Sequence, residues 1–153
     1  MSGDENLLKL VDADEAPPSD YRLQDQIGFV LRKASQRHIA IFARHISDLT
    51  PPQFAALARL YEEGSTSQNQ LGVMVAMDAA TIKGVIDRLK SRGLVALAPD
   101  SDDRRRLAVS ITDEGRQLVE KLIPLAIEAT RETIAPLSPK ETATLLKLLA
   151  RIT

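Results

Sequence analysis

Apolar residues recur every three or four positions through most of this 153-residue chain, a spacing that predicts helices. The longest such stripe runs through residues 20–47 and predicts a first helix over that range. Its members are Leu23, Ile27, Val30, Ala34, His38, Ile41 and His45. A helix of this length is longer than is usual in globular proteins and suits a helix shared between two subunits.

Residues that favour helix starts divide the rest of the chain into five shorter helices, which makes six in all. The predicted N-caps are Thr50, Ser67, Asp78, Thr112 and Ser138. Thr50 and Ser138 are each followed by Pro and, three residues on, by Gln or Glu, which predicts capping boxes. Gly64 and Gly93 are predicted to end the second and fourth helices.

Two short β-favouring runs, residues 94–98 and 107–111, lie between the fourth and fifth helices. Residues 100–106 would join them as a hairpin loop, and this loop carries three consecutive arginines. The predicted fold is therefore mainly α with a small β-hairpin wing. A helix followed by a basic hairpin suits a module that places the helix in a DNA major groove and the loop beside it.

The fourth helix is predicted to be amphipathic. Its inward face holds Ile82, Val85, Ile86 and Leu89. Its other face holds Ala80, Lys83, Gly84 and Asp87, flanked by Thr81 and Arg88. Small residues let the helix backbone approach base edges, and Thr, Lys and Arg side chains can contact bases or phosphates. An ordinary surface helix of mixed charge would show the same pattern.

The charge distribution favours a local nucleic-acid surface over a generally basic protein. Residues 81–106 hold seven basic and four acidic residues, a net charge of +3 in a chain whose total is −1. A run of charge is often only a solvated surface, but this one falls in a loop between two strands. An Asp there can hold one Arg and leave another free to reach a minor groove.

Composition excludes several classes of site and function. The chain has no cysteine, so it has no disulfide, thiolate metal site or thiol redox sensor. Aromatic residues make up only 3%, too few for a platform that stacks single-stranded bases. No metal site, cofactor or catalytic motif is predicted, so we do not expect an enzyme. An acidic N-terminus without a long apolar run predicts a cytoplasmic protein with no membrane association.

Several segments together resemble the MarR family of winged helix-turn-helix regulators over about residues 20–152. The segments are LTPPQFAALARLYEEG (49–64), SQNQLG (67–72), MDAATIKGVIDRLKSRGLV (77–95), DDRRRLAVSITDEGRQL (102–118) and LSPKETATLLKLL (137–149). The resemblance implies a homodimer that binds a pseudo-palindromic site in double-stranded DNA. It also implies a winged lobe at residues 48–112 and a helical dimerisation region at 20–47 and 113–153. The frequent acidic residues of 1–19 and the closing Pro17-Pro18 predict a terminal tail or a packed arm.

The resemblance also assigns DNA-binding residues by position. The recognition helix would contribute Ala80, Thr81, Lys83, Gly84 and Arg88, and the wing would contribute Asp103, Arg104 and Arg105. Gln68 and Asn69 would contact phosphate at the start of the third helix, unless they serve only as caps.

Members of this family usually repress transcription until a small aromatic acid binds between the dimer helices and the winged lobe. A weaker resemblance to members that control aromatic-acid catabolism adds aryl-CoA thioesters as effectors. The candidate pocket residues are Phe29, Arg32, His38, Phe42 and Tyr61. Core packing is the simpler interpretation of each, and a satisfied core or interface residue is the favoured interpretation of both His38 and His45. In the alternative, His38 meets the ligand carboxylate with Arg37 or Arg32.

The main prediction is a ligand-responsive repressor. The alternatives are a constitutive or architectural DNA-binding protein without an effector, a transcriptional activator, and a winged module that binds protein. Release from DNA by a ligand would exclude the constitutive factor. Absence of any sequence-preferred DNA binding would favour the protein-binding module.

Overall fold

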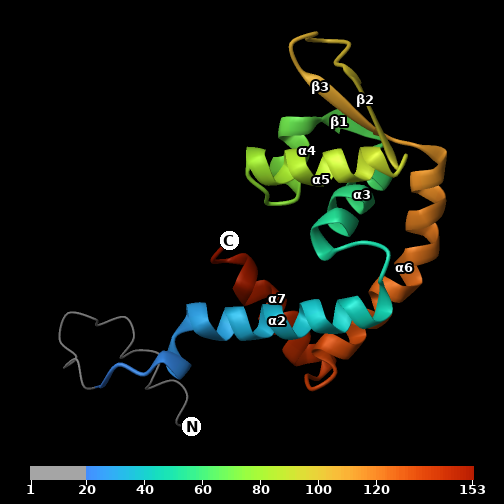
Figure 1. Ribbon diagram of the computed structural model, residues 1–153. Coiled ribbons are helices and arrows are strands. Elements are labelled where there is room, and N and C mark those ends of the chain that lie inside the picture. Colours follow the sequence, from blue (N-terminus) through green and yellow to red (C-terminus); the bar gives the residue numbers. More distant parts are fainter. Residues whose placement is uncertain (1–19) are drawn as a thin grey trace. The chain divides into compact units, whose positions relative to one another are not determined.

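The computed structural model describes residues 20–153, so the predicted tail or arm at residues 1–19 lies outside the described residues. The chain divides into two structural units, and the boundary between them falls after Gln36. The described part contains six α-helices and three strands, and Figure 1 shows their order. The helices are α2 (Ile27–His45), α3 (Pro51–Glu63), α4 (Gln68–Met74), α5 (Ala79–Ser91), α6 (Asp113–Ile134) and α7 (Pro139–Ala150). The strands are β1 (Ser65–Ser67), β2 (Val95–Pro99) and β3 (Leu107–Ile111).

The predicted first helix over residues 20–47 is wrong at both ends, because α2 runs only from Ile27 to His45. A separate 3₁₀ turn, η2 (Leu23–Asp25), precedes it. Gln26 breaks the two apart with an extended backbone at φ −85° and ψ 130°. The side chain of Gln26 donates to the Arg22 carbonyl oxygen at 3.1 Å. An apolar stripe cannot reveal this break, because Leu23 and Ile27 keep helical spacing across it.

The predicted helix starts are confirmed at all five caps. Thr50 forms the expected capping box with Gln53, and Ser138 forms one with Glu141. The backbone and side-chain hydrogen bonds at Ser138 lower the pKa of the Glu141 carboxyl group. Each cap satisfies backbone N–H groups that lack a partner within the helix, so these sites define the helix boundaries locally.

The predicted hairpin is confirmed, and the structure adds a third strand to it. β2 pairs with β3 in antiparallel register from Val95–Ile111 to Pro99–Leu107. β1, which was not predicted, pairs with the other edge of β3, so the strand order is β1-β3-β2. Residues 65–67 are Ser, Thr and Ser and show no apolar alternation. Their pairing depends on the presence of β3.

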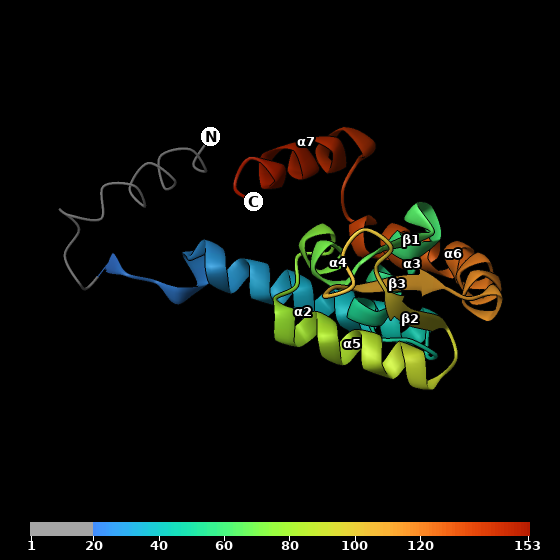
Figure 2. The same cartoon turned by 90° about the horizontal axis from the view of Figure 1, so that it is seen from above.

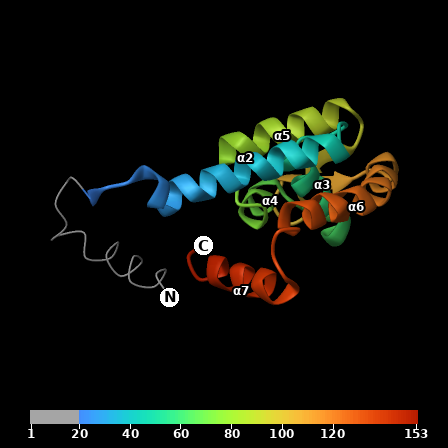
Figure 3. The same cartoon turned by 90° about the horizontal axis from the view of Figure 1, so that it is seen from below.

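A single core joins the helices to the sheet. Figure 2 shows α5 alongside β2, and Figure 3 shows α3 beside α6. Fully buried side chains come from α3, α4, α5, β3 and α6: Leu57, Leu60, Leu71, Ile82, Ile86, Leu89, Val109, Val119 and Leu122. Burial of each such side chain contributes about 1.5–3 kcal/mol of transfer free energy. This core fixes α5 and the hairpin against one another.

The start of α6 is held tightly against the start of the hairpin. The Thr112 hydroxyl donates to the Gly93 carbonyl oxygen at 2.7 Å and accepts from the Gly115 N–H at 3.1 Å. A Cβ on Gly115 would lie 2.2 Å from the Leu94 carbonyl oxygen. The T-x-x-G sequence is therefore required by packing, since only glycine permits this approach.

Large apolar side chains are exposed on several helices of the described protein, and more than half of them lie on α2 and in the C-terminal segment. α7 has no buried residue. Leu145, Leu146, Leu148 and Ile152 are exposed in the C-terminal segment, and Ile27, Val30, Leu31 and Ile39 are exposed on α2. Exposed apolar surface on this scale is typical of a subunit interface, as the dimeric fold requires. Among residues 20–153, no helix combines the length and apolar character needed to cross a membrane.

Candidate nucleic-acid interface and ligand groove

The α5 helix presents a polar surface opposite its buried stripe. Asp78 caps the helix, and its carboxylate accepts from the Thr81 N–H at 2.7 Å. This backbone hydrogen bond lowers the pKa of the Asp78 carboxyl group. A charged carboxylate therefore occupies the N-terminus of α5, so an added phosphate there would meet negative charge. Contacts from α5 to DNA must come from its exposed side chains.

The predicted recognition residues of α5 are all at least partly exposed. Ala80, Thr81, Lys83 and Arg88 are exposed, and Gly84 is half-buried. Lys83 is not a free cation, because its Nζ lies 2.9 Å from Asp87 Oδ2. The Arg88 side chain has no ion-pair or hydrogen-bond partner among residues 20–153 and is free to meet a phosphate. The Lys83–Asp87 pair was not part of the sequence prediction, although the spacing of four residues would have indicated it.

The wing loop is organised around its aspartates. Asp103 Oδ1 accepts from the Arg105 N–H at 3.0 Å, and Asp103 Oδ2 lies 3.7 Å from Arg106 Nε. The Asp100 N–H donates to the Arg106 carbonyl oxygen at 2.9 Å and closes the loop. The guanidinium groups of Arg104 and Arg105 have no partner in the described part of the chain, and both residues are exposed. Asp103 thus shapes the loop, and two arginines remain available for DNA.

Gln68 and Asn69 begin α4, but neither side chain is used by the cap. The cap is Ser67, whose hydroxyl accepts from the Gln70 N–H at 3.2 Å. Gln68 is half-buried and Asn69 is exposed. Neither side-chain amide has a hydrogen-bond partner among residues 20–153, and their contact with phosphate stays a prediction.

The two histidines take part in a polar contact between α2 and α6. The Thr133 hydroxyl donates to the Ala129 carbonyl oxygen at 2.8 Å. His38 Nδ1 lies 2.8 Å from the same hydroxyl, so Nδ1 is the donor in that pair. Arg37 Nη2 donates to the Glu132 carbonyl oxygen at 3.1 Å. The Arg37 and His38 groups that were candidates for a ligand carboxylate thus contact the last turn of α6.

Glu132 is the acidic centre of this α2–α6 polar contact. Its Oε2 lies 2.7 Å from His45 Nε2, and its Oε1 pairs with Arg44. The hydrogen bond from His45 and the charge of Arg44 lower the pKa of the Glu132 carboxyl group. His45 therefore binds a protein carboxylate in this structure.

The other predicted pocket residues lie at different places. Phe42 is buried, and its ring centroid lies 5.8 Å from that of Phe54 and 6.3 Å from that of His38. The Tyr61 hydroxyl donates to Glu120 Oε1 at 3.1 Å, and this bond raises the pKa of the tyrosine. Phe29 and Arg32 belong to the first half of α2, before the unit boundary. Among the predicted pocket residues in 37–153, the structure brings His38 and Phe42 together.

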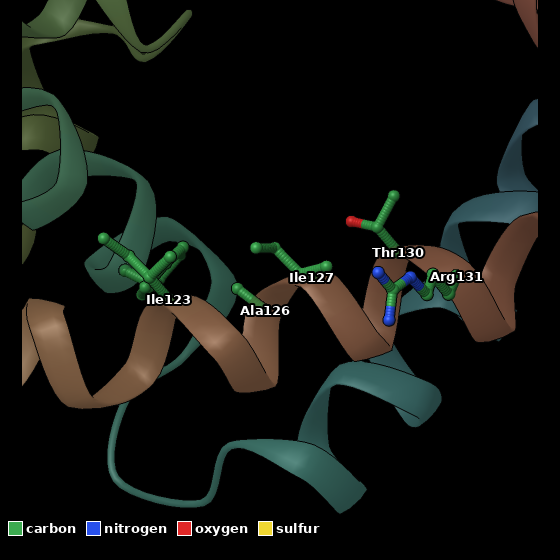
Figure 4. A pocket seen from close by; sticks show the side chains of 6 residues that line it. Ile123, Ala126, Ile127, Thr130 and Arg131 are labelled. Carbon is green, nitrogen blue, oxygen red and sulfur yellow. The ribbon is translucent and has the colours of Figure 1, made fainter.

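An open groove of about 310 Å³ lies between α3 and one face of α6. Its lining residues are Phe54, Ile123, Ala126, Ile127, Thr130 and Arg131. Figure 4 shows the α6 residues following one another along the helix. The walls are mainly apolar, with the Thr130 hydroxyl and the Arg131 guanidinium at one end. None of these residues was in the predicted pocket, although the apolar spacing along 123–130 could have indicated them.

No group of His, Asp or Glu side chains among residues 20–153 is arranged to hold a metal ion. The candidate binding surfaces in this part of the chain are therefore the polar face of α5, the wing and the α3–α6 groove.

Comparisons with known proteins agree with this geometry. Residues 49–107 match the MarR family. The HTH-type transcriptional repressor NicR of Pseudomonas putida is 40% identical over 134 residues, covering 86% of this chain and 85% of NicR. A crystal structure of a probable transcriptional regulator from Pseudomonas aeruginosa is 54% identical with a TM-score of 0.84, covering 86% of this chain and all of that one.

A third similar protein is described with a regulatory ligand. The structure of Bordetella bronchiseptica BpsR concerns regulation of its DNA binding by 6-hydroxynicotinic acid. It is 40% identical with a TM-score of 0.84, and the match covers 90% of this chain and 97% of BpsR.

Proposed function

This chain belongs to the MarR family of transcriptional regulators, and from that premise we propose that it is a dimeric repressor that a one-ring aromatic acid releases from its operator. It acts by binding and not by catalysis, and it works in the cytoplasm, where DNA is available. Residues 48–112 form the DNA-binding lobe, and residues 20–47 and 113–153 form the dimerisation region. The main observation is a pair of wing arginines, Arg104 and Arg105, that are exposed and have no partner among residues 20–153. The exposed polar face of α5 and the apolar groove between α3 and α6 accompany it.

The DNA-binding part rests on the unpaired cations. Arg104 and Arg105 extend from a loop whose backbone Asp103 holds in shape, so the loop itself needs no ordering before their guanidinium groups enter a narrow minor groove. Arg88 on α5 can meet a phosphate. Since the chain's net charge is only −1, affinity must come from these few groups, present twice in a dimer.

Replacement of a wing arginine tests the DNA-binding part. We expect Arg105→Ala to weaken operator binding by about 1–3 kcal/mol and to reduce the salt dependence of binding. Operator would first be selected from random double-stranded DNA, and affinity would then be measured at several salt concentrations. Lys121→Ala, which removes an exposed cation on α6, is the matched control. If Arg105→Ala and the control bind the operator with equal affinity, the Arg105 side chain does not contact the DNA.

The effector part rests on the α3–α6 groove. Its volume of about 310 Å³ is at the small end of ligand pockets and suits a single aromatic ring. The Arg131 guanidinium pairs with the Glu128 carboxylate on the surface of α6, and a ligand carboxylate that displaces Glu128 would take the same counter-charge. The Thr130 hydroxyl offers a hydrogen bond to a ring substituent. BpsR, which is 40% identical, is described as regulated by 6-hydroxynicotinic acid, an acid of this class. A CoA thioester would leave its nucleotide outside the groove, so the free acid is favoured.

Filling the groove tests its assignment. We expect Ile127→Trp to occupy the space of the ring and to abolish thermal stabilisation by aromatic acids, with operator binding retained. Leu125→Trp, on another face of α6, is the control and should still be stabilised. The ligand panel contains benzoates, hydroxycinnamates, hydroxynicotinates and their CoA esters. Undiminished stabilisation of Ile127→Trp would place the effector elsewhere. If no aromatic compound stabilises the unaltered protein, the constitutive alternative is correct.

A further inference from the structure

Gly84 lies in the middle of α5, where neither backbone conformation nor packing within the fold requires a glycine. A Cβ built on Gly84 would meet nothing within 4 Å. Gly28, in the first turn of α2, also has nothing within 4 Å of a built Cβ, and each of the remaining described glycines has an internal reason. Gly64 and Gly93 have positive φ, Gly72 would bring a Cβ 3.1 Å from the Met77 carbonyl oxygen, and Gly115 packs on Leu94.

Glycine inside a helix costs about 1 kcal/mol relative to alanine. The free protein therefore bears this cost at Gly84 without a packing gain. A mid-helix glycine on an exposed face allows another molecule to approach the backbone closely. Gly84 lies on the polar face of α5, so it permits such an approach there.

Asp87 lies one turn further along the same outward face. At 100° per residue, residues 80, 84, 87 and 91 lie opposite the buried stripe at 82, 85, 86 and 89. The phosphates of DNA repel a carboxylate, so a carboxylate on a DNA-binding face weakens binding unless its charge is offset. The Lys83 ammonium, 2.9 Å from Asp87 Oδ2, offsets this charge. The pair thus presents one donor and one acceptor side by side, next to the gap left by Gly84.

In the major groove, a G·C pair offers the matching pattern. Cytosine presents the N4 amine as a donor, and guanine presents O6 and N7 as acceptors. Aspartate is a known partner for the cytosine amine, and lysine for the guanine acceptors. Adjacent donor and acceptor groups on the protein therefore fit adjacent acceptor and donor groups on one base pair.

We propose that Asp87 and Lys83 together recognise a G·C pair in each half-site, and that Gly84 provides the close approach this contact needs. Asp87 accepts from cytosine N4, and Lys83 donates to the guanine. The inference rests on the proposed DNA-binding function and adds to it which residues determine the sequence preference. Asp87 was absent from the residues that the sequence analysis assigned to DNA.

Selection of binding sites from random double-stranded DNA tests the base preference. The unaltered protein should enrich a two-fold motif with an invariant C·G pair at one position of each half-site. Asp87→Asn should replace that preference with adenine, since an amide pairs with adenine N6 and N7. The affinity for a site with adenine at this position, relative to a site with cytosine, should rise on the order of tenfold in the variant. Asp113→Asn, which makes the same change at an exposed site on α6, should leave the motif unaltered.

These outcomes distinguish failure of the base-recognition inference from failure of the proposed repressor function. An unchanged motif for Asp87→Asn would overturn the inference while the repressor assignment stands. Absence of any enriched motif with the unaltered protein would overturn both. Thermal melting of Asp87→Asn confirms that the variant is folded, which its exposed position leads us to expect.

Gly84→Ala gives a second and independent test. The added methyl group improves helix propensity, so the variant should melt at the same temperature as the unaltered protein or higher. Its operator affinity should fall, by roughly fivefold or more, because the methyl group fills the gap at the base edges. Ser91→Ala, also on the outward face but near the end of α5, serves as the control. Unchanged operator affinity for Gly84→Ala would contradict a close approach at this position.

Discussion

Ala76 holds the turn between α4 and α5 in a conformation that alanine normally avoids. Its φ of 56° is the one positive value for a non-glycine residue in the described chain. The Met77 N–H donates to the Gly72 carbonyl oxygen at 2.8 Å, and the Ala76 N–H donates to that of Val73 at 3.2 Å. These two bonds form a Schellman motif, in which glycine is the usual residue at the position of Ala76.

We therefore expect Ala76→Gly to stabilise the protein by about 0.5–1 kcal/mol, since relief of left-handed strain exceeds the extra chain entropy of glycine. Denaturant unfolding measures the change. Ala40→Gly, at an exposed position inside α2, is the matched control and should lose about 1 kcal/mol. A loss of stability in Ala76→Gly comparable to that of the control would show that the left-handed backbone carries no strain.

Residues with a local signal were predictable from the sequence, and Ala76 was not. Thr50 and Asp78 cap helices because a side-chain oxygen meets an N–H three residues away, which depends only on neighbouring residues. The Thr112 cap and Gly115 were recognised as a motif, although their reason is the approach to Leu94 from another element. Nothing local distinguishes Ala76 from an alanine inside a helix.

At the scale of elements, the α2–α6 polar contact joins the end of α2 to the last turn of α6. Arg44 and His45 bind the Glu132 side chain, and His38 binds Thr133. The sequence showed the histidines on an apolar stripe but could not show their partners, which lie more than eighty residues away. β1 escaped prediction for the same reason, because it is a strand only when β3 lies beside it.

The lowered pKa of Glu132 gives this contact a pH dependence of defined sign. The unfolded chain binds the proton more readily than the folded protein, so the contribution of Glu132 to stability is present above its unfolded pKa of about 4.5. It is lost as the pH falls through the lower folded-state pKa. The melting temperature of the protein should therefore exceed that of Glu132→Gln by a constant amount at neutral pH, and the difference should disappear in acid.

Thermal melting from about pH 7 to about pH 3 measures this difference. Glu114→Gln, an exposed carboxylate at the start of α6 with no ion-pair partner in residues 20–153, is the control. A difference that persists unchanged into acid would mean that the charge of Glu132 contributes nothing to the contact.

At the scale of the whole molecule, the exposed leucines of the C-terminal segment require a partner surface. Leu146 is 62% exposed and Leu148 is 50% exposed, on a helix that has no buried residue. A dimer of the family type would cover them. We expect Leu146→Glu to raise the dimer dissociation constant at least tenfold, because a charge would be buried at the interface.

Sedimentation equilibrium measures the change in association. Leu107→Glu alters a leucine that is 47% exposed on β3, in the wing, and should leave the dimer intact. A fully dimeric Leu146→Glu protein would place the subunit interface on another surface.

Release of the repressor by an effector requires that ligand binding and DNA binding oppose each other. Its direct test is fluorescence anisotropy of labelled operator bound to the protein, titrated with 6-hydroxynicotinic acid and related one-ring aromatic acids. The account predicts a saturable fall in anisotropy with at least one of these acids, and no fall with the Ile127→Trp variant at the same concentrations. An operator complex that remains intact at saturating concentrations of every acid in the series would contradict it.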